Sequence, residues 1–115
     1  MVTAVSTERD LTAIAQAHAV VVSASPSANS TITGTRVPID LEFNSRIDLS
    51  RSRLAITDAR KQTRALSLAL DSPANRLQAL ASDLAPGAYR LEWNVLSTDG
   101  HITRGRLTFK VAAHL

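Results

Sequence analysis

The stretch Tyr-Arg-Leu-Glu-Trp-Asn-Val, residues 89–95, decides the fold class of this 115-residue chain. Large apolar side chains alternate with polar ones, so an extended backbone places all the apolar groups on one face. A helix would spread the same side chains around its circumference. The stretch therefore predicts a β-strand with one buried face and one face in water, and Trp93 is expected to anchor the core.

The same alternation recurs on both sides of this stretch. It predicts further strands at residues 37–43, 54–56, 66–70 and 107–111, and a β-branched run predicts another at 19–23. Residues 77–80 fit either a strand or a helical turn. Turn residues such as Asp71-Ser72-Pro73 and Ala85-Pro86-Gly87 separate these segments. About seven short strands at this spacing predict an all-β antiparallel sandwich.

The composition is that of a single soluble globular domain. Hydrophobic residues make up 44% of the chain and charged residues 20%, close to the averages for such domains. There is no cysteine, which excludes disulfides and thiolate metal sites. No apolar run approaches the roughly 18 residues of a membrane span, so we expect no transmembrane segment.

The first seventeen residues do not follow the strand pattern. Ala15-Gln16-Ala17 resembles a signal-peptidase site placed directly before His18, but Glu8, Arg9 and Asp10 are not typical of a signal peptide. We interpret residues 1–17 as an N-terminal extension or leader remnant and residues 18–115 as the sandwich domain. An added extension, a truncated leader and a native N-terminal arm all stay open.

The charge pattern gives little support for a nucleic-acid partner. The net charge is +3, and eleven of the thirteen basic residues are arginines that never form a run of five. Four aromatic residues are present, and three of them occupy core-type positions, which leaves few rings for stacking on bases. We expect a monomer that does not bind nucleic acid. A basic domain that binds an anionic surface is a weaker third interpretation.

No motif for catalysis is present. The chain has neither a Gly-x-Ser-x-Gly elbow nor a glycine-rich phosphate loop, and the zinc-protease pattern His-Glu-x-x-His is also missing. The sequence therefore predicts a protein that is not an enzyme.

The segment Ser97-Thr98-Asp99-Gly100-His101 is the strongest candidate for chemistry. Asp-Gly between two alternating strands is typical of a hairpin turn, and on that interpretation His101 merely begins the returning strand. Alternatively, Asp99 and His101 offer an oxygen and a nitrogen to a metal ion, and His18, at the start of the first strand, is the candidate third ligand. Nitrogen and oxygen ligands without sulfur suit Cu(II), with Zn(II) or Ni(II) as competitors.

Several segments in order resemble the CopC family of bacterial periplasmic copper-binding proteins. Residues 18–26 (HAVVVSASP) are similar to the mature start of the family, and residues 39–44 (IDLEFN) to a following strand. The most specific similarity is residues 84–101 (LAPGAYRLEWNVLSTDGH), followed by Gly105 and the strand at 107–111. The resemblance extends over almost all of the chain after residue 17.

The resemblance implies an Ig-like Greek-key β-sandwich that binds Cu(II) in the periplasm and serves in copper homeostasis or resistance. Carried over by position, the metal ligands are His18, which also supplies its N-terminal amine in the family, Asp99 and His101. The partners implied are the copper ion and a membrane copper transporter. Two departures matter: His18 is internal in this chain, and the sole methionine is Met1, so a methionine-rich Cu(I) site is not supported. An interaction module that has lost tight metal binding is the alternative.

Overall fold

The structure, a computed structural model, describes residues 19–113. Within this range the chain forms eight β-strands and one short 3-10 helix, η1 (Leu49–Arg51). The strands are β1 (Val21–Ser25), β2 (Thr31–Ile32), β3 (Val37–Phe43), β4 (Arg53–Thr57), β5 (Thr63–Ala65), β6 (Arg76–Ala81), β7 (Gly87–Leu96) and β8 (Ile102–Val111). The predicted extension at 1–17 lies outside the described residues, as does His18. No helix among the described residues is long and apolar enough to cross a membrane.

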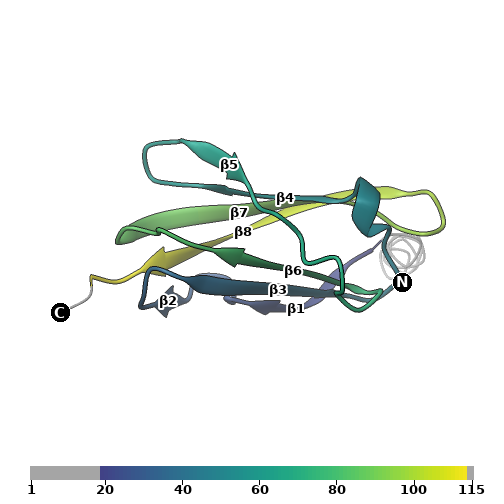
Figure 1. The fold of residues 1–115 in the computed structure, drawn as a ribbon, viewed down its shortest axis with the longest axis horizontal. Helices are drawn as coiled ribbons and strands as arrows, with labels where there is room; N and C mark the ends of the chain where they lie inside the picture. The colour runs from purple at the N-terminus through teal and green to yellow at the C-terminus, as the bar shows by residue number, and fades with distance from the viewer. Residues whose placement is uncertain (1–18, 114–115) are drawn as a thin grey trace, which may run out of the picture.

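The strands form two sheets, and the prediction of an all-β sandwich is confirmed. One sheet has three strands in the order β1-β3-β6, and the other has five in the order β2-β8-β7-β4-β5. All pairings are antiparallel except that of β2 with β8, which is parallel over two residues. The strands of both sheets run along the long axis of the molecule (Figure 1).

The inward face of each long strand is the apolar one that the sequence predicts. In β3 every second residue from Val37 to Phe43 is buried, while Pro38 between them is exposed. Leu91 and Val95 of β7 are completely buried, and on β8 the buried residues Leu107 and Phe109 are the cross-strand partners of Leu91 and Tyr89. Full burial of one such side chain stabilises the fold by about 1.5–3 kcal/mol. These positions together form one core between the sheets.

Trp93 lies on the inward face and packs against the core, as predicted, but its side chain is only half-buried. Its partner across the β7–β8 ladder is Gly105. A Cβ atom at Gly105 would lie 2.4 Å from the Trp93 indole, so the ring occupies the space that a side chain would need. The largest completely buried side chains are instead Phe43 and Phe109.

The predicted strand at 66–70 is wrong. The strand in this region is β5, which ends at Ala65, and the following residues cross from one sheet to the other. The Leu66 amide donates to Leu54 of β4 in the large sheet, and the Ala69 amide donates to Gln78 of β6 in the small sheet. Leu66 packs against the core during this crossing, whereas Leu70 is 85% exposed. Alternating leucines here reflect a crossing segment and not a strand.

The stretch at 77–80, which fitted two structures in the sequence, belongs to strand β6. The count is therefore eight strands instead of about seven, because β2 and β5 were not predicted and the strand at 66–70 is absent. Figure 1 shows η1, the β7–β8 hairpin and the start of β1 at one end of the sandwich. The β4–β5 and β6–β7 connections lie at the opposite end. We call these the hairpin end and the distal end.

Candidate functional site

The candidate site is the loop of residues 97–101 that joins β7 to β8. The Ser97 amide donates to the His101 carbonyl at 2.9 Å, and the Gly100 amide donates back to the Ser97 carbonyl at 2.9 Å. Gly100 has a φ of +95°, a backbone conformation that glycine adopts far more easily than other residues. The predicted hairpin tip is therefore confirmed, and it holds Asp99 and His101 two residues apart on the same rim.

One oxygen of Asp99 collects the hydrogen bonds of this loop. Asp99 Oδ1 accepts from the Ser97 hydroxyl and from the His101 amide, the latter at 3.2 Å. The imidazole Nδ1 of His101 lies 3.1 Å from the same oxygen. Ser97 itself is buried, so its hydroxyl is a fixed donor underneath an otherwise exposed carboxylate.

These donors keep Asp99 ionised. The Ser97 hydroxyl, followed by the His101 side chain and amide, lowers the pKa of the Asp99 carboxyl from 3.8 to about 2. Hydrogen bonds to the charged form favour that form. A metal ion needs deprotonated ligands. Because this carboxylate is already ionised at neutral or mildly acidic pH, a metal ion does not have to displace a proton from it.

Asp99 and His101 are also open to solvent. Their side chains are 51% and 52% exposed, and they lie side by side at the tip of the hairpin. Among residues 19–113 no group of three or more His, Cys, Asp or Glu side chains could hold a metal ion. The structure thus brings together two of the three predicted ligands, and His18, the third, lies outside the described residues.

The start of the described chain is tied to this loop through a short connecting segment. The Val20 amide donates to Asn44 Oδ1 at 2.8 Å, and the Asn44 amide donates to the Val20 carbonyl at 2.9 Å. Two residues further on, the Arg46 carbonyl accepts from the Thr98 amide at 3.2 Å. Ala19 is 1% exposed, so the chain is held against the core immediately after position 18.

Two of the residues that build this end were not singled out as functional from the sequence. Ser97 positions the Asp99 carboxylate, and Asn44 fixes the start of the first strand. A serine two residues before an aspartate in a turn is a local signal for such a hydrogen bond. The contact between Asn44 and Val20 joins residues 24 positions apart, and no local pattern could have predicted it.

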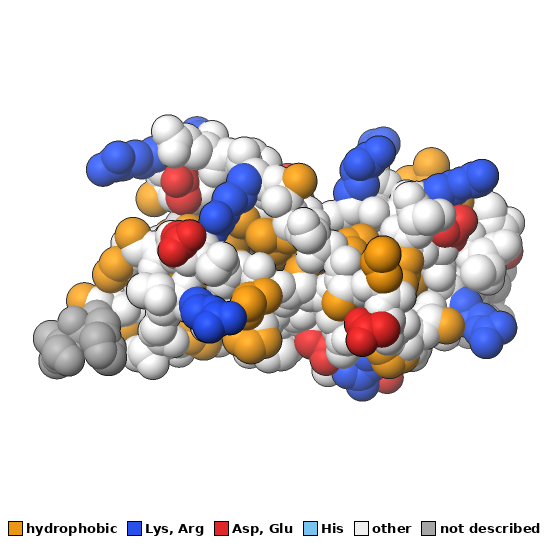
Figure 2. All heavy atoms as spheres, in the orientation of Figure 1, with side chains coloured by type: hydrophobic (Ala, Val, Ile, Leu, Met, Phe, Trp, Pro, Cys, Tyr) orange, Lys and Arg blue, Asp and Glu red, His pale blue; other side chains and the backbone are white. Residues whose placement is uncertain are grey.

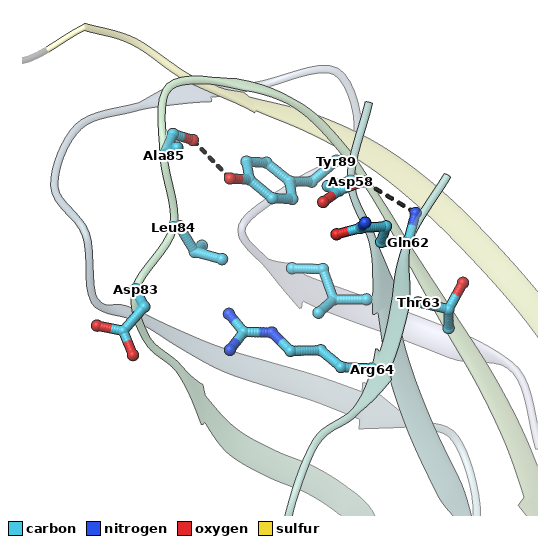
Figure 3. A pocket seen from close by; sticks show the side chains of 9 residues that line it. Asp58, Gln62, Thr63, Arg64, Asp83, Leu84, Ala85 and Tyr89 are labelled. Carbon is cyan, nitrogen blue, oxygen red and sulfur yellow. Dashed lines mark hydrogen bonds between the residues drawn. The ribbon is translucent and has the colours of Figure 1, made fainter. Parts of the chain in front are cut away.

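A cavity lies at the distal end, between the β4–β5 connection and the segment before β7. It has a volume of about 360 Å³ and is lined by Arg64, Asp83, Leu84 and Tyr89, among others (Figure 3). Two of its polar side chains bond to the chain itself: Tyr89 Oη donates to the Ala85 carbonyl at 2.5 Å, and Arg64 donates to the Ser82 carbonyl. These two side chains therefore help to fix the segment before β7.

Comparison with known proteins connects the chain to one family. Residues 21–112 match the CopC domain family. Protein YobA of Escherichia coli strain K12 is 33% identical over 98 residues, which cover 83% of this chain and 79% of YobA. The copper transport protein CutJ of Bacillus subtilis strain 168 is 28% identical over 98 residues, but the matched part is only 18% of CutJ.

Solved structures agree with these sequence matches. The crystal structure of CopC from Methylosinus trichosporium OB3b has a TM-score of 0.76 and 31% identity, covering 85% of this chain and 97% of that protein. PcoC, a methionine-rich copper resistance protein from Escherichia coli, has a TM-score of 0.68 over 82% of this chain and 98% of PcoC. Because PcoC is only 23% identical in sequence, this second comparison shows a similarity of fold alone.

Proposed function

The chain belongs to the CopC family, and on this basis we propose that it binds Cu(II) as a periplasmic carrier or buffer in copper homeostasis or resistance. The names of CutJ and PcoC, a copper transport protein and a copper resistance protein, support a role with copper. The observation that carries the proposal is the Asp99–His101 pair at the tip of the β7–β8 hairpin.

The spacing of this pair suits two neighbouring ligands of one metal ion. Nitrogen and oxygen ligands bind such ions at about 2.0–2.2 Å, so two ligands at right angles are roughly 3 Å apart. The Nδ1 atom of His101 and Oδ1 of Asp99 are 3.1 Å apart. A metal ion can therefore bridge the two groups with little rearrangement, provided that Nδ1 is deprotonated.

The nature of the donors favours Cu(II) as the cargo. An imidazole nitrogen and a carboxylate oxygen suit Cu(II), whereas Cu(I) prefers thiolates and thioethers. The chain has no cysteine, and its sole methionine is Met1. The proposed site therefore differs from one based on methionine, despite the likeness in fold to the methionine-rich PcoC.

His18 is the proposed third ligand, and the proposed domain begins at this residue. The position next to it, Ala19, is held against the core at the end of the sandwich that carries Asp99 and His101. If residues 1–17 are removed, His18 offers both its ring nitrogen and its amine. The amine has a reference pKa near 8 and loses its proton to a metal at modest cost, whereas a peptide nitrogen does not.

The proposed role is binding and transfer, with no catalytic step. A monomer that gives up its ion to a membrane copper transporter fits a site that is exposed at a tip instead of enclosed. Exchange with a partner requires that a second set of ligands reach the ion, and the exposed Asp99 and His101 side chains permit this approach.

A Cu(II) titration of three forms of the protein tests the proposal. The forms are the intact chain, a chain beginning at His18 and a chain beginning at Ala19. We expect the form beginning at His18 to bind at least tenfold more tightly than the intact chain, which corresponds to about 1.4 kcal/mol. Competition with a chromophoric chelator measures each affinity.

The form beginning at Ala19 is the matched control, because it has a free amine but lacks the imidazole of His18. It should bind no better than the intact chain. Equal Cu(II) affinities for all three forms would show that neither the ring nor the amine of His18 is a ligand. If none of them binds Cu(II), the chain is a sandwich module without copper function.

A further inference from the structure

The outer face of the five-stranded sheet is strongly basic. Side chains that alternate with the buried ones on β4, β7 and β8 point away from the core. Among them are five exposed cations and one acid, Glu92. The cations, which together we call the basic face, are Arg53, Arg90, Arg104, Arg106 and Lys110.

Most of these cations form no ion pair with an acid. Arg90 Nε lies 3.5 Å from Glu92 Oε1, and Glu92 also accepts from the Thr57 hydroxyl at 3.4 Å. Glu92 is also the cross-strand partner of Arg106. Within residues 19–113, no carboxylate forms an ion pair with the other four cations. Five cations against one carboxylate give this face a net positive field.

The centre of the basic face has a shallow depression. Asn94 of β7 lies between Arg53 of β4 and Arg104 of β8 in one row across the sheet. These three residues line a hollow of about 290 Å³ together with Ala55, Gly105 and the acidic residue Glu92. The two guanidinium groups outnumber the one carboxylate here, so the hollow has a net positive charge.

The outer face of the small sheet has a more balanced charge than the basic face. There Arg76 is shared between two acids, with Nη1 2.8 Å from Asp40 Oδ2 and Nη2 3.5 Å from Glu42 Oε1. On the side of the molecule seen in Figure 2, basic and acidic side chains are interspersed. The excess positive charge is thus concentrated on the outer face of the large sheet, which gives the molecule a preferred orientation toward an anionic partner.

We propose that the basic face binds the surface of an anionic phospholipid bilayer. Protein interfaces usually have aromatic anchors in their centres. The aromatic residues on the large sheet, Tyr89, Trp93 and Phe109, all lie on its inward face. An extended sheet face without such anchors is suited to a bilayer, which is flat and fluid and needs no matching shape.

Apolar residues at one end of the same face fit this partner. Leu96 and Ile102 pair across the hairpin on the outer side, and Ile102 is 60% exposed. Cationic side chains beside an exposed apolar residue are typical of segments that lie at a membrane surface. The inference does not depend on copper, because none of these residues belongs to the proposed metal site.

Co-sedimentation with vesicles tests the proposal on the full chain. The vesicles contain either phosphatidylcholine alone or phosphatidylcholine with 30% phosphatidylglycerol (about one anionic lipid in three). We expect binding to the anionic vesicles only, and weaker binding as salt is raised, because salt screens exposed charges. Replacing Arg104→Gln and Arg106→Gln together should lower the partition coefficient roughly thirty-fold.

The matched control is the pair Arg36→Gln and Arg60→Gln, which removes the same net charge from exposed positions outside the basic face. It should lower the partition coefficient less than about threefold. Equal losses in the two pairs, or equal binding to both kinds of vesicle, would overturn the proposal. Binding to immobilised poly-glutamate without binding to anionic vesicles would indicate that the partner of the basic face is an acidic protein. That result would also overturn the proposal.

Discussion

The two ends of the sandwich differ in the hydrogen bonds that their acidic side chains accept. At the hairpin end, Ser97, Asp99 and His101 bond to one another and expose their acid and imidazole to solvent. At the distal end, polar side chains bond to the backbone: Asp58 Oδ1 accepts from the amides of Arg60 and Gln62, both at 2.9 Å. The distal end has a cavity of about 360 Å³, but Tyr89 and Arg64 in its lining already donate hydrogen bonds to backbone carbonyls.

If the hairpin end binds copper as proposed, cavity size is a poor guide to the functional site in this molecule. A site for a metal ion needs two or three ionised or neutral ligands at the correct spacing, and it needs little volume. The hairpin end provides such a pair in Asp99 and His101, whereas the side chains that line the distal cavity include no histidine. Variants at the two ends should therefore separate metal affinity from stability.

The largest expected effect is at His101. His101→Ala removes the ring nitrogen and should weaken Cu(II) binding by about a hundredfold, equivalent to about 2.8 kcal/mol. Asp99→Asn should weaken it less, because an amide oxygen still coordinates but contributes no charge. Both affinities are measured by chelator competition. Asp58→Asn at the distal end is the control and should leave the affinity unchanged, and a loss there would contradict the division between the two ends.

A second large effect is expected in the core near the hairpin end. Gly105→Ala places a methyl group where the Trp93 indole now lies, since the nearest ring atoms are 2.4–2.6 Å from the ideal Cβ position. The ring must shift, and we expect a loss of about 1–3 kcal/mol in the free energy of unfolding. Urea denaturation measures the loss, and the fluorescence of Trp93, the sole tryptophan, reports the displacement.

The control for this variant is Lys110→Ala on the same strand. Lys110 is exposed on the outer face, so its replacement should change the free energy of unfolding by less than about 0.5 kcal/mol. A Gly105→Ala protein as stable as the parent would show that the indole moves at no cost. The close approach of Trp93 would then not be the reason for a glycine at position 105.

Sequence periodicity was sufficient to predict the long strands. Strands β3, β7 and β8 alternate because each has one face in the core, and every predicted inward position on them is buried except Trp93. Periodicity reports which side of a strand is apolar, but it does not report how completely the rest of the fold covers each position on that side. For that reason the half-burial of Trp93 could not be predicted.

The failure at residues 66–70 has a different cause. Leu66 and Leu68 pack against the core from a segment that passes between the sheets, so they mimic the alternation of a strand. Tertiary hydrogen bonds to Leu54 and Gln78 decide the path of this segment, and those partners are distant in sequence. Likewise, the sequence predicted Asp99 and His101 as neighbours from their local spacing, but Asn44 acts through a long-range contact.

A smaller effect is expected at Ser97, and it has a signature in pH. The hydroxyl of Ser97 is the main cause of the low pKa of Asp99, about 2, so Ser97→Ala should raise that pKa toward 3.8. In the parent protein, the stability that the ionised carboxylate contributes is present above about pH 3.8 and is lost as the pH falls through about 2. In the variant the folded and unfolded pKa values lie closer together, so this loss should be smaller and complete at a higher pH. Carboxyl-carbon NMR measures both pKa values.

Ser97→Ala should also weaken Cu(II) binding about tenfold, because partners that orient a ligand contribute 10–100-fold. Ser50→Ala is the matched control: Ser50 donates to Asp48 at 2.6 Å and is the main cause of the lowered pKa of that carboxyl. It should raise the pKa of Asp48 and leave copper binding unchanged. If both serine variants weaken copper binding equally, Ser97 has no specific role in positioning Asp99.

The smallest effect is expected at the distal end, from Tyr89→Phe. The Tyr89 hydroxyl donates to the Ala85 carbonyl at 2.5 Å, while the ring stacks on Phe109 with centroids 5.7 Å apart. The variant keeps the stacked ring and loses only the hydrogen bond, so the free energy of unfolding should fall by about 1 kcal/mol. Urea denaturation measures this change. Cu(II) affinity should stay that of the parent, since the loop of residues 97–101 lies at the other end of β7. A loss of copper affinity in Tyr89→Phe would mean that β7 couples its two ends, and the separation between a binding end and a structural end would then fail.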